Sequence, residues 1–266
     1  MGIDLNTKQI REEIENFNNK SVSSFYDFID KLKKGNSILR LDKEKNYIFL
    51  YRGQTDGNKR LIPKIGRNEK INNISEIEKR IYEEFCRLSY PYLNSKYEPY
   101  DWDLVALAQH HGLSTRLLDW TANPLAALWF AFYENETETD SNRAVWRLVV
   151  QHDKIVNTKE KLEEQKSIGI FKPNHITKRI TAQDGWFTVH NLDNNKFKAI
   201  DEDFSYVIAL NKYSFKLKKE EKEEKRKEIL DALDKFGINY YSLFPDLDGL
   251  SKYLSYHFLP EKTDKD

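Results

Sequence analysis

Apolar residues recur at helical spacing in two long segments of the chain. Residues 8–34 carry apolar side chains three or four positions apart and stop before Gly35, which predicts helix. Residues 75–95 repeat this spacing. The apolar face of this second segment is formed by Ile77, Ile81, Phe85 and Leu88. Its acidic residues Glu76 and Glu78 are therefore expected to face water.

Extended segments alternate with the helical ones. Runs of β-branched and aromatic residues predict strands at 46–54, 115–120, 143–151 and 204–211. Residues 178–191 predict a strand, a turn and a second strand, with Gln183 and Asp184 in the turn.

Further helices follow from their end signals and charge patterns. A short helix is expected over 102–111, ending at Gly112, and the next helix should begin with Asn123 as N-cap and Pro124 at its first position. Mixed-charge residues 216–235 predict a solvated helix, and the C-terminal segment predicts a turn and a packed helix.

The chain shows no internal repeat, low-complexity linker or boundary rich in proline, glycine and serine. We therefore expect one domain over residues 1–266, in which 1–45 form an N-terminal helical elaboration and 46–266 form the core. The predicted fold is α+β, with a central β-sheet flanked by helices.

Composition narrows the classes of partner. The 43 basic and 43 acidic residues cancel, so no overall field favours nucleic acid or anionic lipid, although a local basic groove remains compatible. The single cysteine, Cys86, excludes an intrachain disulfide and fits a reducing compartment. No signal peptide or membrane-spanning run is recognisable. We expect a soluble, cytoplasmic protein that does not associate with membranes.

The segment Tyr51-Arg52-Gly53-Gln54 closes the first predicted strand. A charged residue after an apolar strand needs a partner, and a guanidinium suits a carboxylate or a phosphate. Gly53 permits a sharp turn or a close approach of the backbone to a ligand. Two interpretations remain open for Arg52: a structural bridge, with Asp119 as its candidate partner, or ligand binding.

Residues 108–132 place dense polar chemistry beside the most apolar run of the chain. Thr115, Arg116 and Asp119 lie along a predicted buried strand, where charged side chains require partners. The following helix, anchored by Leu125, Leu128, Trp129 and Phe132, would provide a rigid backing. The polar residues form either a network beneath a pocket or a purely structural network at a strand-to-helix turn.

The adjacent His110 and His111 provide two imidazoles that point apart, too few ligands for a zinc site, so we expect no metal. Either histidine is a candidate general base. No nucleophile elbow, Walker loop or Gly-x-Gly-x-x-Gly motif is present. In the 178–191 segment, Gln183 is either an ordinary turn residue or a polar contributor to a pocket.

Four segments together resemble the FRG domain, a family named for its aromatic-Arg-Gly signature. They are YRGQ at 51–54, LAQHHGLSTRLLDWTANPLAALWFA at 107–131, ITAQDGWFTVH at 180–190 and SLFPDLDGL at 242–250. The family occurs widely in bacteria and phages and has no settled general activity. Phage defence is one of several biological roles that the resemblance leaves open.

A second resemblance is to ADP-ribosyltransferases of the Arg-Ser-Glu type. It implies an ADP-ribosyltransferase-like fold that binds NAD, with Arg52 and Gln54 on its phosphate or ribose and Thr121 near the nicotinamide. His110 or His111 would orient a ribose hydroxyl. Where that family has a catalytic glutamate, this chain offers Gln183 and Asp184.

Three hypotheses follow for the function. The first is an NAD-dependent ADP-ribosyltransferase-like enzyme that acts on a protein or nucleic-acid acceptor. The second is a non-catalytic module that binds a nucleotide or a nucleic-acid end through Arg52 and Arg116. The third is a hydrolase or nuclease that uses Asp119 and a histidine. Release of nicotinamide from NAD distinguishes the first from the others.

Overall fold

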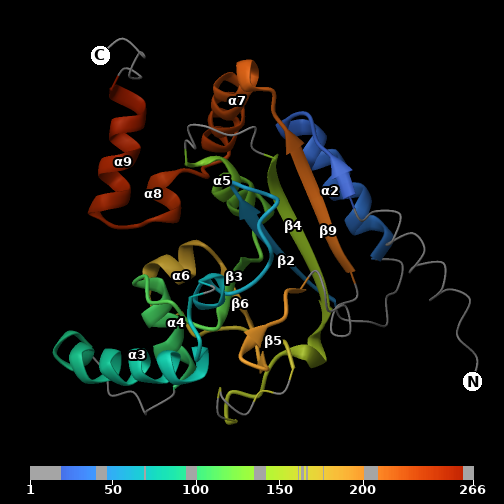
Figure 1. Ribbon diagram of the computed structural model, residues 1–266. Helices are drawn as coiled ribbons and strands as arrows, with labels where there is room; N and C mark the ends of the chain where they lie inside the picture. The colour runs from blue at the N-terminus through green and yellow to red at the C-terminus, as the bar shows by residue number, and fades with distance from the viewer. Residues whose placement is uncertain are drawn as a thin grey trace, which may run out of the picture.

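The computed structural model has a mixed β-sheet at the centre of the fold, with helices packed around it (Figure 1). It describes residues 19–39, 47–68, 70–93, 101–134, 142–160, 162, 165, 167–175, 177–200 and 209–259. The predicted α+β class is confirmed. Among the described helices, none has the length and apolar character needed to span a bilayer.

Seven of the described strands form the main sheet, in the order β1-β9-β4-β2-β3-β6-β5. Their bounds are β1 Asn19–Ser21, β2 Tyr47–Gln54, β3 Leu117–Thr121, β4 Asn142–Gln151, β5 Gly169–Phe171, β6 Gly185–Val189 and β9 Ala209–Lys216. Strand β1 is parallel to β9, and the other neighbours are antiparallel. A separate small ribbon joins β7 Leu192–Asp193 to β8 Lys196–Phe197.

The pairing between neighbouring strands of the sheet is shortest between β2 and β3. These strands are in register only at Tyr51 and Thr121. By contrast, β2 pairs with β4 along its whole length, from Tyr47 to Gln54. The sheet therefore consists of two well-paired halves joined at one residue pair, and side chains can enter the space where β2 and β3 separate.

Eight α-helices are described. Their bounds are α2 Phe25–Leu39, α3 Ile74–Ser89, α4 Trp102–His110, α5 Pro124–Phe132, α6 Lys178–Ala182, α7 Lys222–Lys235, α8 Tyr240–Leu243 and α9 Leu247–Phe258. Helices α2, α5 and α7 pack against the half that contains β2, β4 and β9. Helices α3 and α4 cover the half that contains β3, β6 and β5.

Helix α5 is the central helix of the core, as the apolar run in the sequence indicates. Asn123 caps it by accepting hydrogen bonds from the amides of Leu125 and Ala126, and Pro124 occupies its first turn, as predicted. Trp129 is only 3% exposed, and Leu128 and Phe132 are fully buried. Leu125, the fourth predicted anchor of this helix, is only partly buried.

Gly53 allows α5 to approach β2 closely. A Cβ atom at residue 53 would lie 2.0 Å from the carbonyl oxygen of Ala127 and 2.6 Å from the amide nitrogen of Ala131. Both distances are far below van der Waals contact, so only glycine fits here. The close approach expected at Gly53 is therefore to a helix of the protein itself.

Several local predictions are wrong. The helix predicted to stop before Gly35 continues through this glycine to Leu39. Residues 19–21 form β1 rather than helix, because they pair with β9, and residues 8–18 lie outside the described residues. Residues 178–182 form helix α6 rather than a strand, because the Thr177 side chain caps the amide of Ile180. Glu78 is buried rather than facing water, whereas Glu76 is exposed as expected.

Candidate functional site

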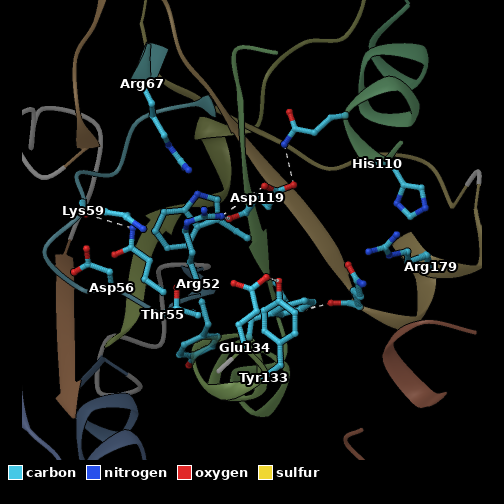
Figure 2. Close-up of a pocket in the computed structure, with 18 residues that line it drawn as sticks. Arg52, Thr55, Asp56, Lys59, Arg67, His110, Asp119, Tyr133, Glu134 and Arg179 are labelled. Carbon is cyan, nitrogen blue, oxygen red and sulfur yellow. Dashed lines mark hydrogen bonds and ion pairs between the residues drawn. The ribbon is translucent and has the colours of Figure 1, made fainter. Parts of the chain in front are cut away.

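A pocket of about 490 Å³ lies where β2 and β3 separate. Its walls come from β2, β3, the C-terminal end of α4, the end of α5 and α6. Figure 2 shows charged side chains reaching it from several sides, with Arg52 and Arg67 on one side and Arg179 and His110 on the other. Segments far apart in the sequence thus contribute to one concave site.

Arg52 spans the space between the two strands. Its Nη1 donates a hydrogen bond to the main-chain oxygen of Asp119 at 2.7 Å, and the Asp119 carboxylate lies 3.6 Å away. Nε is buried and has no partner within the described residues. The side chain is 16% exposed, so Arg52 is largely enclosed. Burial lowers the pKa of its guanidinium, Asp119 partly opposes this, and the Arg67 cation adds to it.

Three further cations line the pocket. Arg67 donates from Nε and Nη2 to the carbonyl of Ile62.

 Burial lowers the pKa of the Arg67 guanidinium, and the Asp119 carboxylate partly opposes this shift. The Arg179 guanidinium lies 4.0 Å from the centre of the Phe244 ring and has no carboxylate within ion-pair distance among the described residues. Lys59 completes the set. These groups offer hydrogen-bond donors to an anionic ligand.

The pocket also contains three carboxylates: Asp56, Asp119 and Glu134. One oxygen of Asp119 accepts a hydrogen bond from Gln109 Nε2 at 2.8 Å, and the Gln109 amide oxygen accepts one from the Thr115 hydroxyl. Four cations therefore face three carboxylates, an excess of one positive charge. Such a site can bind an anion and still offer acceptors to hydroxyl groups of the same ligand.

His110 is neutral in the folded protein at physiological pH. Burial, with the neighbouring Arg179 and His111 acting in the same direction, lowers the pKa of its imidazole to about 4. A neutral imidazole has one donor and one acceptor nitrogen. At neutral pH, His110 is therefore suited to hydrogen bonding with a ligand rather than to ion pairing.

The end of α5 supplies an aromatic and acidic wall. Phe130 and Tyr133 line the pocket, and the Tyr133 hydroxyl donates a hydrogen bond to the Glu134 carboxylate. Burial, followed by the Glu134 interaction, raises the pKa of the Tyr133 phenol, so this hydroxyl keeps its proton. Glu134 itself is exposed. It gives the pocket an accessible carboxylate beside two aromatic rings.

Three predicted residues, Gln54, Thr121 and Gln183, line the pocket, but their polar atoms form hydrogen bonds within the protein. The Gln54 amide accepts from Trp146 and donates to the carbonyl of Lys59. The Thr121 hydroxyl donates to the Gln183 carbonyl at 2.5 Å, and Gln183 Nε2 donates to the carbonyl of Leu243 at 3.0 Å. These bonds fix the ends of β3 and α6 and connect the pocket to α8.

Eight of the twelve predicted site residues line the pocket: Tyr51, Arg52, Gly53, Gln54, His110, Asp119, Thr121 and Gln183. The pocket thus brings together Arg52, His110, Asp119 and Gln183 from distant parts of the chain, whereas Arg116 does not line it.

The other four lie elsewhere for identifiable reasons. Arg116 is buried in an ion pair with Glu78. Thr115 is buried and reaches the pocket only through Gln109. His111 is exposed and contacts the edge of the His110 ring, and Asp184 lies in the turn before β6.

Sequence patterns gave no sign of several pocket residues. Arg67 ends a short 3-10 helix, Lys64–Arg67, and Arg179 lies on α6, in a segment predicted to be a strand. Tyr133 and Glu134 directly follow helix α5 and carry no sequence pattern of their own. Within the described residues, no three histidine, cysteine or acidic side chains are grouped closely enough to hold a metal ion.

Comparison with known families identifies the segment that builds much of this site. Residues 47–141 match the model of the FRG domain. The chain contains an FRG domain. The match includes the segments at 51–54 and 107–131, whereas those at 180–190 and 242–250 lie outside it. Searches of curated proteins and of solved structures found no match.

The matched FRG segment supplies both the scaffold and part of the pocket. Gly53 permits the close contact with α5, and Asn123 caps that helix. Arg52 and Asp119 bridge the two strands at the point where the sheet narrows. Arg179 and Gln183, which complete the opposite side, come from the region after the match.

Proposed function

We propose that this pocket binds a nucleotide that contains a diphosphate, with NAD as the candidate cofactor. The observation that carries the proposal is the arrangement of Arg52. Its Nη1 is held by the Asp119 carbonyl, while Nε has no partner within the described residues. The Nε and Nη2 edge of a guanidinium matches two oxygens of one phosphate.

The positions of the other cations favour a diphosphate over a single phosphate. Arg67 and Lys59 flank Arg52, whereas Arg179 approaches from the opposite side beside His110 (Figure 2). Two linked phosphates would place charge near both groups of cations. Phe130 and Tyr133 offer ring surfaces to a base, and His110 offers a neutral hydrogen-bonding group to a ribose.

Binding is tested by calorimetry with ADP, NAD, AMP, adenosine and inorganic diphosphate. We expect ADP and NAD to bind, adenosine to bind at least about tenfold more weakly, and Arg52→Lys and Arg179→Gln each to weaken binding of ADP by about tenfold or more. Arg87→Ala removes an exposed arginine outside the pocket and should leave affinity unchanged. Equal affinity for adenosine and ADP, or no binding of either, would count against the proposal.

ADP-ribosyl transfer is the second candidate function, and the observation that favours it is Glu134. In this reaction the bond between nicotinamide and ribose breaks, nicotinamide leaves, and an acceptor nucleophile bonds to the ribose carbon while losing a proton. The sequence has Gln183 and Asp184 where the related enzymes have a glutamate. However, Gln183 donates a hydrogen bond to the Leu243 carbonyl, and Asp184 does not line the pocket. Glu134 supplies a pocket carboxylate that can stabilise the developing positive charge.

Release of nicotinamide from NAD tests this second function. Glu134→Gln should reduce release by about a hundredfold or more, as loss of a charge-stabilising group does in other enzymes. Asp56→Asn alters another pocket carboxylate and is the matched control. NAD binding without nicotinamide release, in the presence of candidate protein and nucleic-acid acceptors, would support a non-catalytic binding module instead.

A further inference from the structure

Helix α3 presents an apolar groove that the other described residues cover only in part. The groove encloses about 750 Å³, and its apolar lining consists of Ile77, Ile81, Phe85, Leu88, Tyr92 and Leu113. Leu88 is 56% exposed and Tyr92 is 85% exposed. The sequence predicted this stripe as the core-facing side of the helix, but the buried residues of α3 are Ile74, Glu78 and Tyr82.

The charged residues beside the groove are balanced. The exposed charges of α3 are three acidic residues, Glu76, Glu83 and Glu84, and three basic residues, Lys79, Arg80 and Arg87. This surface therefore has no excess charge to attract an acidic or a basic partner. Acidic and basic residues instead alternate along the helix. A second copy of α3 packed antiparallel to the first would therefore place opposite charges next to each other.

We propose that this groove is an interface between two copies of the chain, related by a two-fold axis that crosses α3 near its middle. A two-fold interface brings residue i against residue j, and j against i. With α3 antiparallel to its copy, Ile77 lies toward Leu88 of the other copy, which closes both ends of the groove. Arg80 and Glu84, which both line the groove, then face each other twice across the axis.

The interface is separate from the nucleotide pocket. The two sites share no lining residue. Helix α3 lies at the edge of the molecule, distant from α9, which also carries strongly exposed apolar residues (Figure 1). The proposal therefore stands or fails independently of nucleotide binding.

Sedimentation equilibrium of the full chain tests the interface. The wild type should sediment with twice its mass of 31.6 kDa at micromolar concentration. Leu88→Asp should weaken association by about tenfold or more, because it places a charge in an apolar contact. Leu254→Asp alters a leucine of α9 that is 43% exposed, and this control should remain dimeric.

A charge exchange tests the two-fold arrangement itself. Arg80→Glu and Glu84→Arg should each weaken association by about tenfold, and the double variant should restore it, because the reversed charges again face each other. Both side chains are exposed, so circular dichroism should show all variants folded. A monomeric wild type, a dimeric Leu88→Asp variant, or a double variant weaker than both single variants would overturn the proposal.

Discussion

Arg116 and Glu78 form a buried ion pair that joins β3 to α3. Arg116 donates from Nε at 2.9 Å and from Nη2 at 2.7 Å to one Glu78 oxygen, and its backbone amide donates to the other at 2.9 Å. Arg116 is 6% exposed and Glu78 is 9% exposed. Arg116, predicted to bind ligand, therefore holds α3 against the start of β3.

Removal of either partner should destabilise the protein strongly. Arg116→Ala and Glu78→Ala each leave a buried charge unpaired, so we expect the free energy of unfolding to fall by about 3–5 kcal/mol. Denaturant unfolding measures this loss. Arg87→Ala breaks an exposed pair with Glu84 and should cost less than about 1 kcal/mol. A loss below about 1 kcal/mol for Arg116→Ala would show that the buried pair does not stabilise the fold.

Gly53→Ala should destabilise the protein by about 3 kcal/mol or more, at the upper end of the cost of overpacking. The added methyl group would overlap the backbone of α5 at Ala127 and Ala131, which cannot move without shifting the helix. Thermal and denaturant unfolding measure the effect. Gly185→Ala is the matched control in another strand, because its new Cβ would meet Ile180 at ordinary contact distances. Similar losses in the two variants would contradict the close-approach explanation.

Local sequence patterns predict the elements whose signals lie within a few residues. The cap at Asn123, the proline after it and the apolar run predict α5 correctly, and the β-formers around Leu50 and Leu148 predict β2 and β4. The strand β1 escapes such patterns because its three residues are extended only through pairing with β9. Tertiary pairing there overrides the helical spacing.

The pocket was only partly predictable for the same reason. Arg52, His110 and Asp119 stand in unusual local contexts, as charged or polar residues beside apolar runs. Arg67 and Arg179 have no such local signal, and only the packing of their segments brings them to the pocket. Glu78 was predicted to face water but is buried, because it pairs with Arg116, which is 38 residues away along the chain.

Arg52 should contribute more to ligand binding than to stability. Its bond to the Asp119 carbonyl is a single charge-assisted hydrogen bond, and the Asp119 side chain is 62% exposed. We therefore expect Arg52→Ala to reduce the free energy of unfolding by about 1–2 kcal/mol and Asp119→Ala by less than about 1 kcal/mol. Chemical unfolding, run beside the nucleotide titration, gives both quantities. Losses of about 3–5 kcal/mol in both variants would assign Arg52 to the scaffold.

His190 should make stability depend on pH below neutrality. Its Nδ1 lies 3.2 Å from the Lys198 carbonyl, which only accepts, so Nδ1 carries the proton and Nε2 accepts from the Thr188 hydroxyl at 3.1 Å. The same hydroxyl accepts from Trp120 Nε1 at 3.0 Å. A second proton on the fully buried imidazole would break this chain, and burial lowers the pKa of His190 to about 4.

An unfolded histidine has a pKa of about 6.5, so between pH 6.5 and 4 the unfolded state binds more protons than the folded state. The stabilisation by His190 is therefore present above about pH 6.5 and is lost as the pH falls toward 4. Its contribution to the free energy of unfolding is on the order of 3 kcal/mol. His190→Gln should be less stable at neutral pH and should show a shallower loss of stability across this window. His152→Gln, at an exposed histidine, should keep the wild-type slope. Denaturant unfolding at intervals through the window measures both slopes, and equal slopes for His190→Gln and the wild type would exclude the proposed proton linkage.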